Sequence, residues 1–287
     1  MNSSTVYQTV DNGYSSIATE AFSSPSQPSK SAQIAASFGY STEQLAALPA
    51  GTNLGLSCGN PLATANLRPY ETMLDLGSGG GLDCLVAARQ MLQTDPSPTG
   101  KIYGVDRSSK MIELARRNAS KSVLPDRLVE FIEAPITKIP LKDASIDLIV
   151  SNCVINLVPD ADKPMVFSEM HRLLKPGGRL AVSDLLAKKD MPDHVRNDAA
   201  LLIGCIAGAS LVDEYHRWMV DTGFEQGSIV LANTNSDLNV YQKQTAPLSC
   251  CSSKQSCESS RKNADKLDFN EWVAAYQIYA VKGKHIS

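Results

Sequence analysis

Seven cysteines carry the most distinctive chemistry in this chain of 287 residues: Cys58, Cys84, Cys153, Cys205, Cys250, Cys251 and Cys257. Their number is odd, and the first residues, MNSSTVYQTVDNGY, lack the basic start and the apolar core of a secretory leader. A disulfide framework is therefore not expected. The pattern predicts free thiols with structural, redox or soft-ligand roles.

Cys153 follows IDLIVSN, an apolar run that predicts a buried strand. The carboxyl ends of strands in an open parallel sheet are where ligands bind. Cys205 lies in GCIAGAS, whose small residues permit a close backbone approach, and Cys58 lies in the glycine-rich stretch 51–61. Three thiols that reach one pocket would form a soft-ligand set, whereas a single buried cysteine ordinarily packs as a small hydrophobe. Cys84 lies one turn into a predicted helix, and a packed, unreactive thiol is as good an interpretation there as a redox role.

The elements that must position these thiols alternate between strand and helix patterns. Predicted strands are 72–77, 101–106, 128–134, 146–152 and 177–186, followed by two late ones, 228–234 and 272–282. Helical spacing occurs between them at 82–92, 109–119 and 163–174. This alternation predicts an α/β fold with a doubly wound, mainly parallel, seven-stranded sheet and helices on both faces.

A glycine-rich turn joins the first strand to the first helix of this sheet. In LDLGSGGGLDC, Gly77, Gly79 and Gly81 let a ligand approach the backbone closely, next to a helix N-terminus that favours a negative group. Asp75 precedes the glycines and suits a cationic amine or sulfonium. Asp106 ends the second strand, where a carboxylate accepts hydrogen bonds from ribose hydroxyls. The alternative for this turn is a nicotinamide dinucleotide site.

The segments LDLGSGGG, GVD and LLKPGGRLAVSD occur in this order between residues 71 and 184 and resemble the class I S-adenosylmethionine-dependent methyltransferases. The resemblance implies a Rossmann-like methyltransferase sheet with a C-terminal substrate-binding region, and S-adenosylmethionine as cofactor. The cofactor-binding residues that we predict on this basis are Tyr14, Asp75, Gly77, Ser78, Gly79, Asp106, Arg107, Pro135, Ile136 and Asn152.

Those residues have distinct predicted roles. Asp75 and the residues 77–79 would line the methionine and ribose part, Asp106 would hold the ribose, and residues 134–136 would border the adenine. Arg107 stands where related enzymes often have a methionine beside the adenine. Tyr14 stands where they carry a tyrosine that caps the cofactor.

The motifs that contain the cysteines resemble one particular family among these methyltransferases. SNCVINLVPD, GCIAGAS and NLGLSCGNP together resemble the arsenite methyltransferase family, over about residues 38 to 240. The family resemblance implies that trivalent arsenic, as arsenite or an arsenic–thiol conjugate, accepts the methyl group in arsenic detoxification. It further implies that Cys58, Cys153 and Cys205 are the arsenic(III) ligands. Cys84 would form a disulfide with Cys58, which glutathione or thioredoxin would reduce as a thiol co-substrate.

Composition shifts along the chain predict its organisation. Residues 1–35 are rich in Ser, Thr and Gln and predict a flexible arm, and Ser41 is the expected N-cap of a helix in STEQLAAL. We predict an S-adenosylmethionine-binding domain over 36–186, an arsenic-binding region over 187–235, a mobile loop with three cysteines over 236–265, and a last strand and tail over 266–287.

The overall composition sets further limits. The formal net charge is −3, with 43% hydrophobic and 20% charged residues, so no nucleic-acid or membrane partner is expected, and the cytoplasm is the expected location. Two alternatives to arsenic methylation stay open. One is a methyltransferase of the same fold that acts on a small organic acceptor, with the cysteines packed. The other is a protein that sequesters arsenic or metal through its thiols.

Overall fold

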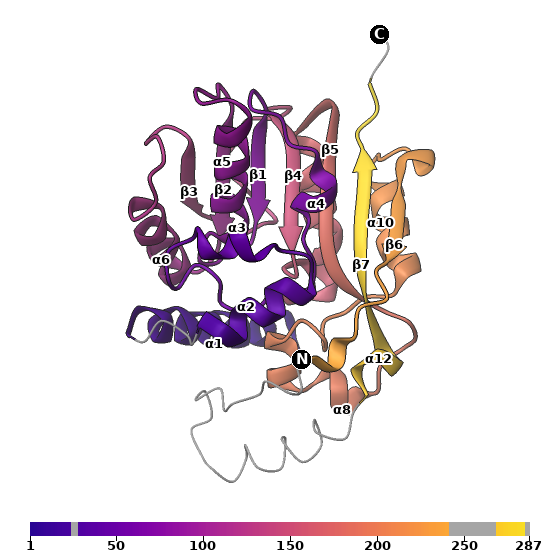
Figure 1. Cartoon of the computed structure of the whole chain (residues 1–287). Helices are drawn as coiled ribbons and strands as arrows, with labels where there is room; N and C mark the ends of the chain where they lie inside the picture. The colour runs from indigo at the N-terminus through magenta and orange to yellow at the C-terminus, as the bar shows by residue number, and fades with distance from the viewer. Residues whose placement is uncertain (24–27, 241–267, 285–287) are drawn as a thin grey trace.

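A computed structural model describes residues 1–23, 28–240 and 268–284. Its centre is a seven-stranded sheet with the order β3-β2-β1-β4-β5-β7-β6 (Figure 1). The strands are β1 (Thr72–Leu76), β2 (Lys101–Asp106), β3 (Val129–Glu133), β4 (Ile146–Asn152), β5 (Leu174–Ala187), β6 (Val230–Asn233) and β7 (Val273–Val281). The first five pair in parallel, and β7 runs antiparallel between β5 and β6. The predicted doubly wound sheet is confirmed.

Two layers of helices bury the sheet. On one face, α4 (Leu62–Ala65), α5 (Leu82–Thr94) and α6 (Ser109–Ser120) contribute to a core that contains Met73, Ile102 and Leu148. On the other face, α7 (Lys163–Leu173) and α10 (Val212–Asp221) pack Phe167 and Tyr215 over the strands. Because both faces are covered, β1 and β4 are almost continuously buried, as their apolar sequences require.

Short helices complete the chain. They are α3 (Thr42–Ala46), α8 (Asp193–Arg196), α9 (Ala199–Ile203) and α12 (Phe269–Trp272), with 3-10 turns at Ile155–Leu157, Asp160–Asp162, Gln226–Ser228 and Leu238–Val240. Ser41 caps α3 as predicted, since its side chain accepts from the Gln44 amide in a complete capping box. In the described residues, no helix combines the length and apolarity needed to cross a bilayer.

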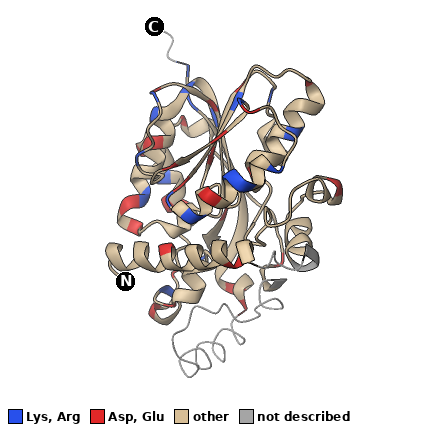
Figure 2. Cartoon of the chain, turned by 90° about the vertical axis from the view of Figure 1, so that its left-hand side faces the viewer, with Lys and Arg blue, Asp and Glu red and all other residues tan. Residues whose placement is uncertain are grey.

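The N-terminal segment differs from the flexible arm that its composition predicts. It forms α1 (Ser3–Ser23) and α2 (Pro28–Ser37), which are labelled in Figure 1. Helix α1 packs against α6 and α9. The small residues on α1 explain the difference, because they permit close helix contact: a Cβ added to Gly13 would lie 2.6 Å from the Ile203 side chain. The charged side chains of α1 are Asp11 and Glu20, so most of this helix is tan in Figure 2.

The C-terminal region follows its prediction in part. Short helices α8, α9 and α10 cover the stretch after β5, and the chain is irregular through GCIAGAS, as expected. Most of the predicted mobile loop, with Cys250, Cys251 and Cys257, lies outside the described residues.

Candidate cofactor site and thiol cluster

The glycine turn after β1 needs the conformational freedom of glycine. Gly77, Gly79 and Gly81 have φ values of +70°, +50° and +89°, in the left-handed region that side chains disfavour. The amides of Gly77 and Ser78 both donate to the carbonyl of Val105, at 2.8 and 2.9 Å. These bonds fix the turn against the end of β2, where Asp106 lies.

Asp106 and Arg107 come together at the end of β2. The Asp106 carboxylate accepts from the Gly79 amide at 3.0 Å and from the Ser108 amide at 2.9 Å, which fixes its orientation. The Arg107 guanidinium pairs with Asp11 of α1, with Nε–Oδ1 at 2.8 Å, and lies 4.2 Å from the Tyr7 ring centroid. Arg107 therefore ties α1 to the end of the sheet as well as lining the site.

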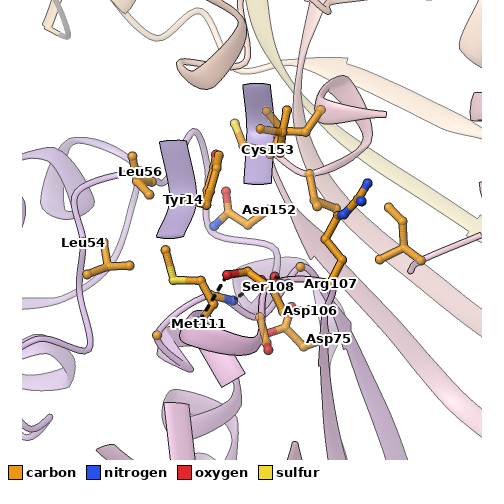
Figure 3. Close-up of a pocket in the computed structure, with 18 of the residues that line it drawn as sticks. Tyr14, Leu54, Leu56, Asp75, Asp106, Arg107, Ser108, Met111, Asn152 and Cys153 are labelled. Carbon is orange, nitrogen blue, oxygen red and sulfur yellow. Dashed lines mark hydrogen bonds between the residues drawn. The ribbon is translucent and has the colours of Figure 1, made fainter. Parts of the chain in front are cut away.

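A cavity opens between the glycine turn, the end of β2 and α1 (Figure 3). All ten predicted cofactor-binding residues lie in its wall: Tyr14, Asp75, Gly77, Ser78, Gly79, Asp106, Arg107, Pro135, Ile136 and Asn152. In the view of Figure 3, Asp106, Ser108 and Met111 lie at one end of the cavity, and Tyr14, Asn152 and Cys153 lie at the other. The structure thus brings the predicted set together. Their contact with a cofactor stays a prediction.

The wall also contains a third buried carboxyl, Asp83, which is not among the residues predicted from the sequence. Its Oδ1 accepts from the Tyr40 hydroxyl at 2.6 Å, and its Oδ2 lies 3.4 Å from Asn152 Nδ2. In the sequence, Asp83 is indistinguishable from the acidic residue that commonly begins a helix. Only the folded chain shows that it points into the cavity beside Asp75.

Burial dominates the electrostatics of this carboxyl pair. It raises the pKa of Asp83 to about 6, against the lowering effect of the Tyr40 and Asn152 hydrogen bonds. The pKa of Asp75 is raised by burial and by the neighbouring Asp83. Neither carboxyl forms an ion pair within the described part of the chain. A cationic ligand group would stabilise both carboxylates.

Two hydroxyls in the cavity wall lack partners. Ser78 Oγ and Thr52 Oγ1 are buried and have no hydrogen bond to any described residue. Buried polar atoms without partners are uncommon, so these hydroxyls are suited to bind polar groups of a ligand. Together with the carboxyls they fit a ligand that has a cationic end and hydroxyls.

The predicted arsenic ligands lie in contact through Cys153, at the carboxyl ends of β4 and β5. Cys58 and Cys153 are paired as a disulfide, with their Cα atoms 6.0 Å apart. The Cys205 thiol donates to the Cys153 carbonyl, with 2.7 Å between sulfur and oxygen. Among the described cysteines, Cys153 is the one that lines the cavity. The cavity therefore extends as far as the thiol cluster.

Asp184, at the end of β5, is a further member of this cluster. Its carboxylate and the sulfurs of Cys58 and Cys153 all lie within 4.8 Å of one another. Burial raises the pKa of Asp184 to about 7, and hydrogen bonds from Tyr215 and the Leu185 amide lower it in turn. The thiols thus lie against a buried polar network.

The environment of Cys84 differs from the one that the family resemblance implies. The expected disulfide between Cys58 and Cys84 is not present, because Cys58 pairs with Cys153 and Cys84 is free and fully buried. From the first turn of α5 the Cys84 thiol points at the sheet, where it donates to Asp75 Oδ2 at 3.3 Å. Its position places it in the hydrophobic core under α5, apart from the cluster that contains the other three thiols.

This strand order, with an antiparallel β7, a glycine turn after β1 and an acid that ends β2, defines a Rossmann-like methyltransferase. A family model described as "Methyltransferase domain" matches residues 67–223. The chain therefore belongs to the methyltransferase domain family.

Its relatives and structural neighbours include arsenic enzymes. An arsenite methyltransferase of Halobacterium salinarum is 43% identical over 65% of this chain and 46% of its own length. The arsenite methyltransferase of Homo sapiens is 34% identical over 56% of this chain and 43% of its own length. The chain thus spans under half of the length of these curated relatives. The crystal structure of CrArsM, an arsenic(III) S-adenosylmethionine methyltransferase from Chlamydomonas reinhardtii, has a TM-score of 0.58 and 26% identity, covering 88% of this chain and 74% of its own.

Proposed function

We propose that this protein transfers a methyl group from S-adenosylmethionine to trivalent arsenic held by cysteine sulfurs, as a step of arsenic detoxification. The observation that carries the proposal is the contact of Cys153 with both Cys58 and Cys205 at the end of a cavity lined by the glycine turn and Asp106. The arsenite methyltransferases among its relatives support the same acceptor.

The cavity residues fit S-adenosylmethionine. Asp75 and Asp83 would hold its ammonium group, Asp106 its ribose, and Pro135 and Ile136 its adenine. Ser78 and Thr52 would supply their unpaired hydroxyls to its polar groups. When bound, the cofactor supplies a methyl group on a positively charged sulfur.

The thiols would bind arsenic by exchange. Trivalent arsenic is soft and thiophilic, and each sulfur–arsenic bond forms as the thiol proton leaves with an arsenic hydroxide as water. Sulfur ligands leave a lone pair on arsenic, which the protein aims at the methyl group. No general base is needed at the attacking atom, so catalysis rests largely on proximity.

The pairing of Cys58 with Cys153 supports a role for these thiols in the redox balance. Methylation of the arsenic lone pair oxidises arsenic from the trivalent to the pentavalent state. If two cysteine sulfurs then leave arsenic as a disulfide, arsenic regains its lone pair and the protein is oxidised in its place. A cellular thiol such as glutathione or thioredoxin would reduce that disulfide by exchange.

Methyl transfer from labelled S-adenosylmethionine tests the proposal directly. With arsenite and excess glutathione, we expect labelled methylarsenicals that depend on both additions. Omission of arsenite controls for other acceptors. If cofactor binds but no arsenical is labelled, the arsenic assignment is wrong and an organic acceptor takes its place.

The affinity for S-adenosylmethionine is expected to fall in acid. A carboxyl whose pKa is about 6 is mostly charged at pH 7.5 and mostly neutral at pH 5.5. Loss of the Asp83 charge then weakens binding of the ammonium group by about fourfold. Calorimetric titration with the cofactor at the two pH values measures this.

Two controls accompany this titration. A carboxyl whose pKa is raised in the fold stabilises the apoprotein as pH falls through that pKa, so protonation of Asp83 does not itself promote unfolding, and a melting curve at pH 5.5 checks that the protein stays folded. Asp83→Asn removes the titrating group and should flatten the pH dependence. An unchanged dependence in Asp83→Asn would exclude Asp83 as its source.

A further inference from the structure

The backbones of two of the clustered thiols are strained. Cys153 has a φ of 58° and Cys205 a φ of 63°, in the left-handed region that residues other than glycine rarely adopt. Such conformations persist only where the surroundings hold them, and they gather at functional sites. These two residues are 52 positions apart in the sequence, so contacts between segments must hold them in place.

Asn156, three residues after Cys153, makes contacts of this kind with the segment that carries Cys205. Its side chain is fully buried, and its Nδ2 atom lies 3.2 Å from the Cys205 carbonyl and 2.7 Å from the Leu185 carbonyl. The same nitrogen lies 2.9 Å from Asp184 Oδ1. One amide thus connects the turn that carries Cys153, the end of β5 and the loop that carries Cys205.

Asp184 and Tyr215 fix the orientation of this amide. The Tyr215 hydroxyl donates to Asp184 Oδ2 at 2.8 Å and lies 3.3 Å from Asn156 Oδ1. The Leu185 amide donates to Asp184 Oδ1 at 2.9 Å. The end of the amide that lies among three acceptors, Asp184 Oδ1 and the carbonyls of Leu185 and Cys205, must be the donor Nδ2.

The loop of Cys205 is also held at its far end. The buried Lys163 ammonium donates to the Gly208 carbonyl at 2.5 Å and to Ser210 Oγ at 2.8 Å. A Cβ at Gly208 would collide with the backbone carbonyl of Asn156, so the two segments are in direct contact. Rigid support at both ends leaves the Cys205 thiol little freedom.

We infer that Asn156 is a positioning residue that sets the separation of the Cys153 and Cys205 sulfurs for one shared arsenic atom. The inference rests on the proposed function, and it concerns the acceptor site at the end of the cavity rather than the residues predicted to bind the cofactor. Asn156 itself touches neither the arsenic nor the cofactor in this role.

The test titrates reduced Asn156→Ala with arsenite and follows the ultraviolet absorption of arsenic–sulfur bonds. We expect the half-saturating arsenite concentration to rise about tenfold, as for the loss of one buried hydrogen-bonded group. The affinity for S-adenosylmethionine, measured by calorimetry, should stay within about twofold of wild type. A purely structural residue would lower the melting temperature without separating these two affinities.

Asn118→Ala is the matched control. Asn118 is equally buried, and its Nδ2 lies 2.9 Å from the Gly80 carbonyl and 3.3 Å from the Gly51 carbonyl, at the glycine turn. We expect this variant to weaken cofactor binding and to leave arsenite binding unchanged. The two variants should therefore show opposite patterns in the two titrations.

Each outcome has a distinct meaning. Equal arsenite affinity in wild type and folded Asn156→Ala overturns the inference and leaves the proposed function intact. If wild type binds the cofactor but no arsenite, both fail. Should Asn156→Ala not fold, Tyr215→Phe replaces it, because its ring can keep the edge contact with Phe167. A weaker arsenite affinity in Tyr215→Phe supports the inference, and an unchanged affinity overturns it.

Discussion

Cys153→Ser is expected to reduce arsenite-dependent methyl transfer by about 100-fold or more, the scale of loss when reacting atoms are misplaced. A hydroxyl replaces the soft sulfur ligand, so arsenic is no longer held at the end of the cavity. Serine tolerates the same left-handed backbone as poorly as cysteine does, so the substitution changes the ligand atom and little else. The measurement compares labelled methylarsenicals from both proteins at the arsenite and cofactor concentrations that saturate the wild type.

Two further readouts show whether the loss comes from the acceptor side. Calorimetry should find the S-adenosylmethionine affinity of Cys153→Ser within a few-fold of wild type, whereas its arsenite titration should fail. Cys84→Ser tests the corrected placement of Cys84, because it should leave arsenite affinity unchanged. Equal methyl transfer by Cys153→Ser and wild type would remove Cys153 from the mechanism.

Gly77→Ala is expected to weaken S-adenosylmethionine binding by about 100-fold. At a φ of +70° an L side chain is strained, and the added Cβ would lie 2.6 Å from Val154 Cβ. Left-handed strain and overpacking each cost roughly 1–3 kcal/mol, and every 1.4 kcal/mol is about tenfold in affinity. The turn must move to relieve the contact, which shifts the amides of Gly77 and Ser78 away from Val105. Calorimetric titration with the cofactor measures the loss.

Gly39→Ala is the matched control for backbone strain. Gly39 has a φ of +94°, but its added Cβ would meet only Asn60 Cβ at 3.7 Å, outside the cavity. This variant should lose some stability and keep its cofactor affinity. The double variant Gly77→Ala/Val154→Ala relieves the clash and should recover part of the binding. An unchanged cofactor affinity in Gly77→Ala would show that this turn is not part of the cofactor site.

The sequence by itself determined the sheet and the composition of the site. Periodic apolar runs separated by helical patterns are local signals, so the doubly wound sheet could be predicted from them. The carboxyl ends of parallel strands share one edge, and this placed Asp75, Asp106 and Cys153 together before any contact was known. The ten predicted cavity residues follow from that rule and from the family resemblance.

Tertiary structure decided what local signals cannot encode. The first helix forms because Gly13 and its neighbours pack on α6 and α9, although their polar composition resembles that of a flexible arm. Cys58 pairs with Cys153 and not with Cys84, because the Cys84 side chain faces the sheet and Asp75. Asn156 looks like any asparagine of a turn, and its role depends on carbonyls that lie 29 and 49 residues away in sequence. Such contacts depend on the direction of each side chain in the packed molecule, which residue type and spacing leave open.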